Sequence, residues 1–129
     1  MLLVMNIILS KAAPPYAVGG TTITGYAAPS RGATEVSLWR IELAPGASSP
    51  LHEMDVEEVF LGVSGEAAAV VDGVESTIGV GDCLILPART PFTLTAGREQ
   101  SFQAVACMTA GGKATLLPGG ETFLPPWAE

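Results

Sequence analysis

Residues 46–65 read GASSPLHEMDVEEVFLGVSG, and the fold prediction starts from this stretch. His52, the chain's only histidine, lies here among four carboxylates, and a run of strand-forming residues, 57–63, follows before Gly65. A second stretch, residues 81–96, reads GDCLILPARTPFTLTA and holds two more short apolar runs. Short apolar runs bounded by glycine and proline are typical of β-strands joined by tight turns.

The rest of the chain continues this pattern. Strand signals recur about every 8–12 residues, and no window sustains the apolar spacing of an amphipathic helix. The pair Asp72-Gly73 between two apolar runs indicates a β-hairpin, because both residues tolerate positive φ. The sequence therefore predicts an all-β sandwich or barrel. The predicted strands are Leu2–Leu9, Thr21–Ala27, Glu35–Leu43, Glu57–Val63, Glu66–Val71, Val74–Ile78, Cys83–Leu86, Phe92–Thr95, Ser101–Met108 and Ala114–Leu117.

Composition excludes several classes of partner. The chain has 129 residues, the length of one domain, and 6 basic against 13 acidic residues give a net charge of −7. Such a balance excludes nucleic-acid binding and disfavours docking on an anionic membrane. The apolar stretch Met1–Leu9 lacks the preceding basic residues of a secretory signal, and two cysteines make no disulfide framework. We therefore expect a cytoplasmic protein.

Residues 46–65 resemble the first conserved motif of the cupin superfamily. Gly46, His52, Glu58 and Gly65 stand in register with that motif, whereas Met54 replaces its second histidine. Residues 81–96 are similar to the second cupin motif. Here Gly81 and Pro87 match, and the motif's later Gly, His and Asn are replaced by Arg89, Phe92 and Ala96.

The resemblance implies a double-stranded β-helix, the jelly-roll barrel of cupins. We expect one barrel domain over residues 1–129, with N-terminal strands in 1–30 and an extended C-terminal tail in 118–129. The tail sequence FLPPW at 123–127 is expected to be non-helical and to lie against the barrel or a neighbouring subunit. Because small cupins commonly form dimers, the resemblance also implies a homodimer, with Met1–Leu9 and the tail as candidate interface elements.

The resemblance further implies a metal site, of which this chain retains only part. Cupins that bind a divalent ion use three histidines and one glutamate, and only His52 and Glu58 remain here. A thioether or thiolate from Met54, Cys83 or Cys107 could add a soft ligand. Glu53, Asp55 or Glu57 could also substitute for a missing ligand, but they have the opposite strand parity and should point outward if the strand is regular. We therefore expect no cofactor, with a divalent metal ion as the alternative.

The two replacements suggest an apolar pocket instead. Its predicted lining is Met54, Phe60, Ile85, Phe92 and Phe102, with His52 and Glu58 as one polar cluster near its mouth. Apolar walls with few polar groups are typical of small-molecule sites. The alternative is that these side chains simply fill a small barrel.

Other interpretations of the same residues stay open. His52 could be a partly exposed loop histidine paired with an acid. The acids Glu53, Asp55, Glu57 and Glu58 could form a solvated rim. Four nearby carboxylates should favour the charged form of His52. Both cysteines lie in apolar runs and are expected to be buried structural thiols.

Three functions follow from these observations. The first is binding of a small, mostly apolar molecule inside the barrel. The second is an enzyme, either metal-dependent (a dioxygenase or isomerase) or metal-free, with proton transfer by His52 and Glu58. The third is a non-catalytic dimeric structural or regulatory barrel.

Overall fold

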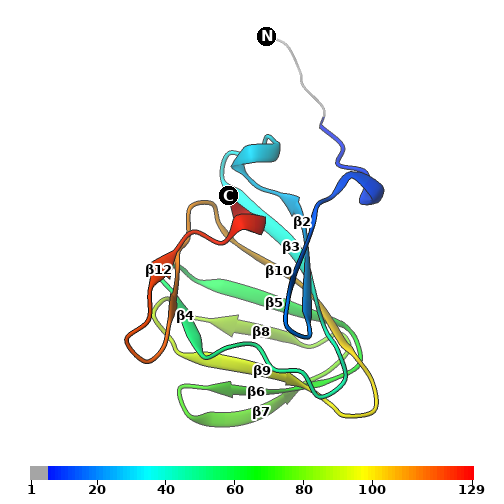
Figure 1. Cartoon of the computed structure of the whole chain (residues 1–129), viewed down its shortest axis with the longest axis vertical. Helices are drawn as coiled ribbons and strands as arrows, with labels where there is room; N and C mark the ends of the chain where they lie inside the picture. The colour runs from blue at the N-terminus through cyan, green and yellow to red at the C-terminus, as the bar shows by residue number, and fades with distance from the viewer. Residues whose placement is uncertain (1–5) are drawn as a thin grey trace.

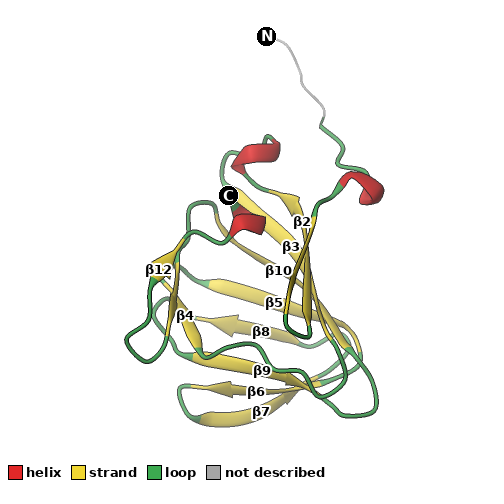
Figure 2. Cartoon of the chain, in the orientation of Figure 1, coloured by secondary structure: helices red, strands yellow, loops and turns green. Residues whose placement is uncertain are grey.

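Two antiparallel sheets facing each other form the protein (Figures 1 and 2). The computed structural model describes residues 6–129. The first sheet has the strand order β1-β2-β3-β10-β5-β8, and the second has the order β12-β11-β4-β9-β6-β7. The strands are β1 (Pro15–Val18), β2 (Thr21–Ala27), β3 (Val36–Leu43), β4 (His52–Met54), β5 (Glu58–Ser64), β6 (Ala67–Val71), β7 (Val74–Ile78), β8 (Cys83–Leu86), β9 (Phe92–Ala96), β10 (Phe102–Thr109), β11 (Ala114–Leu116) and β12 (Thr122–Phe123). This arrangement confirms the all-β prediction.

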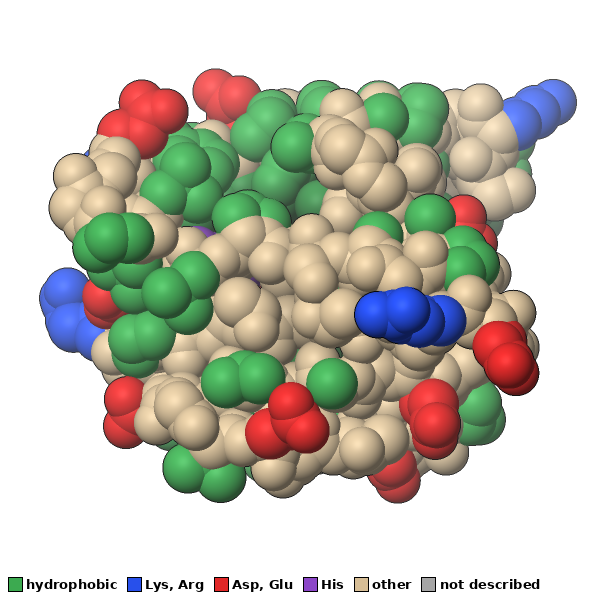
Figure 3. Space-filling model, turned by 60° about the horizontal axis from the view of Figure 1, so that its bottom comes forward, with side chains coloured by type: hydrophobic (Ala, Val, Ile, Leu, Met, Phe, Trp, Pro, Cys, Tyr) green, Lys and Arg blue, Asp and Glu red, His purple; other side chains and the backbone are tan. Residues whose placement is uncertain are grey.

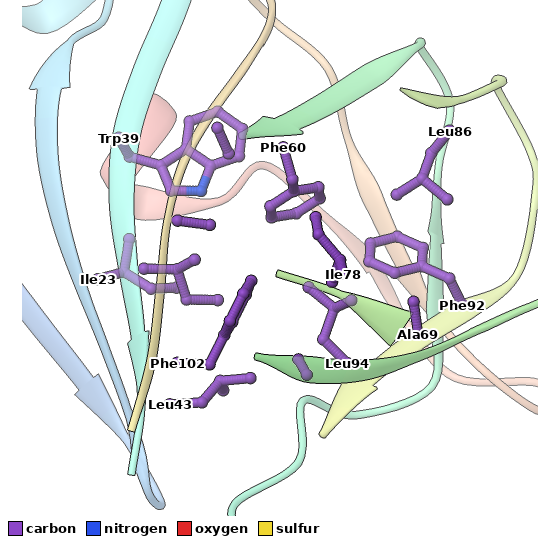
Figure 4. Close-up of a cluster of buried hydrophobic side chains, with 14 of the residues drawn as sticks. Ile23, Trp39, Leu43, Phe60, Ala69, Ile78, Leu86, Phe92, Leu94 and Phe102 are labelled. Carbon is purple, nitrogen blue, oxygen red and sulfur yellow. The ribbon is translucent and has the colours of Figure 1, made fainter. Parts of the chain in front are cut away.

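The core lies between the two sheets and is built by strand alternation. Every second residue of β3, β9 and β10 is buried, because successive side chains of a strand point to opposite faces. Large side chains from both sheets converge there, as Figure 4 shows. They include Trp39, Leu43, Phe60, Leu86, Phe92, Leu94 and Phe102.

Turn chemistry fixes the register of the hairpins. Asp72 and Gly73 have φ of 49° and 80°, and Val71 pairs directly with Val74, so the predicted hairpin between β6 and β7 is confirmed. Gly65 has φ of 70°, and a Cβ atom there would lie 2.1 Å from the carbonyl oxygen of Ser101. Only glycine fits this turn, which gives a physical reason for the last glycine of residues 46–65.

Several strand predictions need correction. The predicted strand Leu2–Leu9 falls partly outside the described residues, and residues 6–9 form no strand but lead into a 3₁₀ turn, Ser10–Ala12. Three strands were not predicted, namely β1, β4 and β12. Each is four residues or shorter, so its pairing with neighbours determines it more than its own sequence does.

The C-terminal tail lies against the barrel, as predicted, but it is not wholly non-helical. Residues 126–128 form a 3₁₀ turn, which is compatible with proline because Pro126 occupies its first position. The turn packs on β2 and β3, where Ala128 is buried. The hydroxyl of Ser37 donates to the carbonyl oxygen of Ala128 at 3.1 Å, and Nη2 of Arg31 donates to that of Trp127 at 2.8 Å. The tail is therefore fixed against the first sheet. Within residues 6–129, no helix is long and apolar enough to cross a membrane.

Arg89 provides a test of backbone strain. It is exposed, has φ of 60°, and donates its backbone N–H to the carbonyl oxygen of Met54 at 2.7 Å. A left-handed conformation costs a non-glycine residue roughly 1–2 kcal/mol. Arg89→Gly relieves this strain, but glycine also increases the entropy of the unfolded chain, which offsets part of the gain. We therefore expect a net rise of about 1 kcal/mol in the free energy of unfolding. Arg89→Ala keeps the Cβ atom and should give no gain. Denaturant unfolding measures both variants, and an equal change in the two would contradict strain at this position.

Candidate functional site

His52 lies at the start of β4 with its ring held in one tautomer. Its cross-strand neighbours are Phe92 on β9 and Leu116 on β11, and its ring centroid is 4.4 Å from that of Phe92. Nδ1 lies 2.8 Å from the carbonyl oxygen of Pro50. Because a carbonyl only accepts, Nδ1 carries the hydrogen, and in the neutral ring Nε2 carries the lone pair.

Glu58 is a carboxyl group inside the core. It begins β5, points inward together with Phe60, and is only 3% exposed. Its cross-strand neighbours are Leu86 and Met108, both buried and apolar. Oε1 is buried without a hydrogen-bond partner. Buried polar atoms are almost always paired, so Oε1 retains hydrogen-bonding capacity that no other residue of the described chain uses.

Two aromatic rings connect these residues across the barrel. The rings of Phe60 on β5 and Phe92 on β9 meet edge to face, with 5.9 Å between centroids. The ring of His52 packs against the ring of Phe92 as well. Met54, two residues after His52 on β4, is also buried. We call His52, Met54, Glu58, Phe60 and Phe92 the interior cluster. The sequence predicted all five as site residues.

Burial sets the charge of both titratable groups. Desolvation raises the pKa of Glu58 from 4.5 to about 8. Desolvation also lowers the pKa of His52 below its ordinary value of 6.5, and the hydrogen bond to Pro50 opposes this only in part. The cluster therefore holds a neutral carboxyl and a neutral imidazole at pH 7.

The predicted charging of His52 by nearby acids is wrong. Asp55 and Glu57 are exposed, and Oδ1 of Asp55 accepts the backbone N–H of Lys113 at 2.7 Å. Carboxylates lie scattered over the surface in Figure 3. The solvated-rim interpretation fits the exposed Asp55 and Glu57 but fails for Glu58, which is buried. His52 is half-buried, as the loop-histidine interpretation expects, but it belongs to a strand, and its ring hydrogen-bonds to the carbonyl oxygen of Pro50 instead of an acid.

Other predicted lining residues lie elsewhere. Ile85 is 60% exposed because its cross-strand partner is Val59, on the outer face, while Leu84 and Leu86 turn inward. Phe102 is fully buried, but it lies four residues along β10 from Ala106, the partner of Phe60. That spacing places Phe102 about 14 Å along the barrel from the interior cluster.

The cysteines do not join the cluster. Cys83 is exposed, so the prediction of a buried thiol is wrong for it. Cys107 is half-buried, and it alternates with buried Ala106 and Met108, so its side chain belongs to the outer face. Neither cysteine can supply a ligand beside His52.

Comparison with known proteins identifies the family. A family model described as a cupin domain matches residues 39–106, more than half of the chain. The chain belongs to the cupin family. A search of curated protein sequences gives no match.

Solved structures share the cupin fold at low sequence identity. The polyketide cyclase RemF from Streptomyces resistomycificus has a TM-score of 0.79 at 18% identity, over 95% of this chain and 89% of that chain. KdgF from Halomonas sp. has a TM-score of 0.71 at 14% identity, over 82% of this chain and 94% of that chain. Salicylate 1,2-dioxygenase from Pseudoaminobacter salicylatoxidans has a TM-score of 0.70 at 19% identity, over 81% of this chain and 31% of that chain. These likenesses show a jelly-roll fold and leave the activity of this cupin unresolved.

The residues present do not fit the four-ligand metal site of cupins. Phe92 stands directly opposite His52, at the position of the second-motif histidine, and has no donor atom. Within residues 6–129, no three His, Cys, Asp or Glu side chains gather into a group that could hold an ion. The interior cluster thus offers one imidazole, one neutral carboxyl and one thioether.

Sequence reasoning missed some of the residues that shape the cluster. The carbonyl oxygen of Pro50 fixes the tautomer of His52, and Leu86 and Met108 exclude water from Glu58. The alternation along 102–109 could have identified Met108 as inward-facing. The Pro50 contact had no sequence signal.

The raised pKa of Glu58 predicts a specific pH dependence of stability. Between pH 4.5 and about 8 the folded state keeps a proton that the unfolded state releases, so the free energy of unfolding should fall as pH rises through this range. The Glu58→Gln variant has no titrating group at position 58, so its free energy of unfolding should fall less over this pH range. Urea unfolding of both proteins between pH 5 and 8.5 gives the difference, and parallel profiles would contradict a buried neutral carboxyl.

Proposed function

We propose that this cupin binds a small, mostly apolar molecule with one oxygen function inside the barrel, at the interior cluster. The observation that carries the proposal is the buried, unpartnered Oε1 of Glu58. Leaving such an atom unpaired costs roughly 1–3 kcal/mol. A ligand that forms a hydrogen bond with Oε1 recovers this cost. A carboxyl group that served only to fill the core would gain nothing from remaining unpaired.

The polar groups define what the ligand must carry. A neutral Glu58 can donate its O–H to a carbonyl or hydroxyl oxygen, and Nε2 of His52 can accept a hydrogen bond. The cluster contains no cation, so a phosphate or carboxylate would be buried without a counter-charge. Ketones, phenols and alcohols therefore fit better than anions.

The walls define the rest of the ligand. Phe60, Phe92 and Met54 present ring faces, ring edges and a thioether, all apolar and polarisable. Such walls favour a flat aromatic or alicyclic skeleton. Among proteins with this fold, RemF is a polyketide cyclase, and that likeness supports the proposal only through the shared barrel.

A matched pair of probes tests the binding proposal. We expect 1-tetralone to bind about tenfold more tightly than tetralin, because the carbonyl oxygen adds one hydrogen bond worth about 1.4 kcal/mol to the same skeleton. Glu58→Leu should remove this preference, whereas Glu57→Leu, at the exposed neighbouring acid, should keep it. Titration calorimetry at pH 6.5 measures all six combinations. Equal affinity of the wild type for both probes, or binding of neither, would refute the proposal.

Proton transfer is the second candidate function. The observation that favours it is an acid and a base at neutral pH in one apolar site, Glu58 protonated and His52 unprotonated. On a ketone, Nε2 of His52 would remove a proton from the α-carbon. The C–H electron pair would form the C=C bond of an enol as Glu58 delivers its proton to the carbonyl oxygen.

Deuterium uptake distinguishes catalysis from binding alone. In D₂O, we expect the wild type to exchange the C2 hydrogens of 1-tetralone at least a hundredfold faster than buffer, and His52→Asn to reduce the rate to that of buffer. Glu57→Leu should behave like the wild type. Proton NMR follows the loss of the C2 signal. Tight binding without exchange would leave the protein a binding module and exclude this second function.

A further inference from the structure

The last residues of the chain cross from one sheet to the other at the end of the barrel where the interior cluster lies. The red C-terminal segment in Figure 1 runs from β12 toward β2 and β3. We propose that residues 124–128, which we call the C-terminal strap, are a movable cover that detaches from the first sheet to admit the ligand and closes behind it. The inference rests on the proposed function, since it concerns how a ligand reaches the interior cluster.

The strap begins at the second sheet, two strands from the interior cluster. Phe123, the last strand residue before the strap, pairs with Ala114, and Ala114 pairs on its other side with Met54. Direct cross-strand neighbours point to the same face of a sheet, so Phe123 faces inward with Met54, and it packs against the core. The strap therefore starts from the same inward-facing row as a residue of the cluster.

The strap ends on the first sheet, again two strands from the interior cluster. Oγ of Ser37 donates to the carbonyl oxygen of Ala128 at 3.1 Å, and both residues are fully buried. Ser37 pairs with Met108, and Met108 pairs with Glu58. At a strand spacing of about 4.8 Å, the backbone of Glu58 lies roughly 10 Å from that of Ser37 along this row. The strap thus spans the end of the barrel between the rows that contain Met54 and Glu58.

A glycine on β2 makes room for the strap. Gly25 is buried and pairs with Trp39, an inward-facing residue of β3. A Cβ atom at Gly25 would lie 2.7 Å from the carbonyl oxygen of Trp127, which is closer than real Cβ contacts come. The docked position of the strap therefore depends on the absence of a side chain at residue 25.

Few contacts hold the strap in place. The carbonyl oxygens of residues 127–129 accept hydrogen bonds from the side chain of Arg31, the hydroxyl of Ser37 and the backbone N–H of Ser30. The last strand of the described chain ends at Phe123, so the strap itself belongs to neither sheet. Detachment breaks these hydrogen bonds and the packing of one short turn, and it leaves both sheets intact. Segments held in this way open locally at a small fraction of the free energy of global unfolding.

One buried donor on the strap favours opening. Nε1 of Trp127 is buried and has no hydrogen-bond partner within residues 6–129. The ring itself packs edge to face on Tyr16, with 6.2 Å between centroids. In the docked strap this N–H is removed from water without a replacement, whereas in the detached strap water can accept its hydrogen bond. The unpaired donor therefore reduces the free-energy difference between the closed and the open strap.

Thiol labelling inside the barrel tests opening without any ligand. The probe is Met108→Cys, whose side chain lies between Ser37 and Glu58, in a chain that also carries Cys83→Ser and Cys107→Ser. A thiol reagent reaches the new cysteine only while the strap is open, so the labelling rate measures the population of the open state. We expect slow labelling of the probe protein.

Two further substitutions in the probe protein loosen the strap by different means. Ser37→Ala removes one of its hydrogen bonds and should speed labelling about fivefold. Gly25→Ala places a methyl group against the strap and should speed labelling at least tenfold. The matched control is Gly97→Ala, because a Cβ atom there lies 3.9 Å from its nearest neighbour, and labelling should not change.

Urea separates opening of the strap from global unfolding. Local opening exposes little surface, so labelling should depend weakly on urea below the unfolding transition, whereas labelling through global unfolding rises steeply. Unchanged labelling in both Ser37→Ala and Gly25→Ala would overturn the proposal. Labelling that follows global unfolding in every variant would also overturn it.

Binding kinetics show whether the strap is the route of the ligand. Because the strap is closed before and after entry, Ser37→Ala in the otherwise wild-type chain should raise the association and dissociation rate constants of 1-tetralone by the same factor. The Kd should stay within twofold of the wild-type value, as stopped-flow tryptophan fluorescence can measure. Unchanged rate constants would mean that the ligand enters elsewhere and would overturn the proposal. Faster labelling without binding of 1-tetralone would support a strap that opens and would count against the proposed function alone.

Discussion

The edge-to-face contact between Phe60 and Phe92 joins the two sheets beside Glu58 and His52. Phe60 belongs to β5 of the first sheet and Phe92 to β9 of the second, and their centroids are 5.9 Å apart. This contact brings the strand starts that carry Glu58 and His52 into one interior. Water is excluded from His52 by the ring of Phe92 and from Glu58 by Leu86 and Met108. The charge states of the site therefore result from core packing rather than from a pairing of opposite charges.

One buried carboxyl makes this interior more than a hydrophobic core. Glu58 lies between Leu86 and Met108 on its neighbouring strands, and desolvation keeps it neutral near pH 7. His52 is neutral for the same reason, and Pro50 directs its lone pair to Nε2. Phe92 occupies the position of a metal-ligating cupin histidine, so an apolar ring replaces a ligand at this place in the interior. A neutral donor and a neutral acceptor in an apolar enclosure suit an uncharged oxygen-bearing ligand.

Much of the fold was predictable because its signals are local, whereas the charge and exposure of single residues were not. The strands Thr21–Ala27, Val74–Ile78 and Cys83–Leu86 have the predicted bounds, because a glycine lies within two residues of at least one end of each. β4 was missed because His-Glu-Met has no strand preference of its own and becomes a strand by pairing with β11 and β9. In the run 83–86 every residue is apolar, so only the register with β5 shows that Ile85 faces outward. The burial of Glu58 depends on Met108, fifty residues away in sequence, and no local pattern reports it.

The claim that Glu58 is a neutral, desolvated carboxyl within the barrel underlies the proposed function. Carbon-13 NMR of protein labelled at the glutamate carboxyl carbons measures its titration directly, with Glu58→Gln assigning the signal. We expect this carboxyl to titrate with a midpoint near 8, and we expect that midpoint to change when 1-tetralone is added. A midpoint near 4.5 would show a solvated or paired carboxylate and would contradict the account.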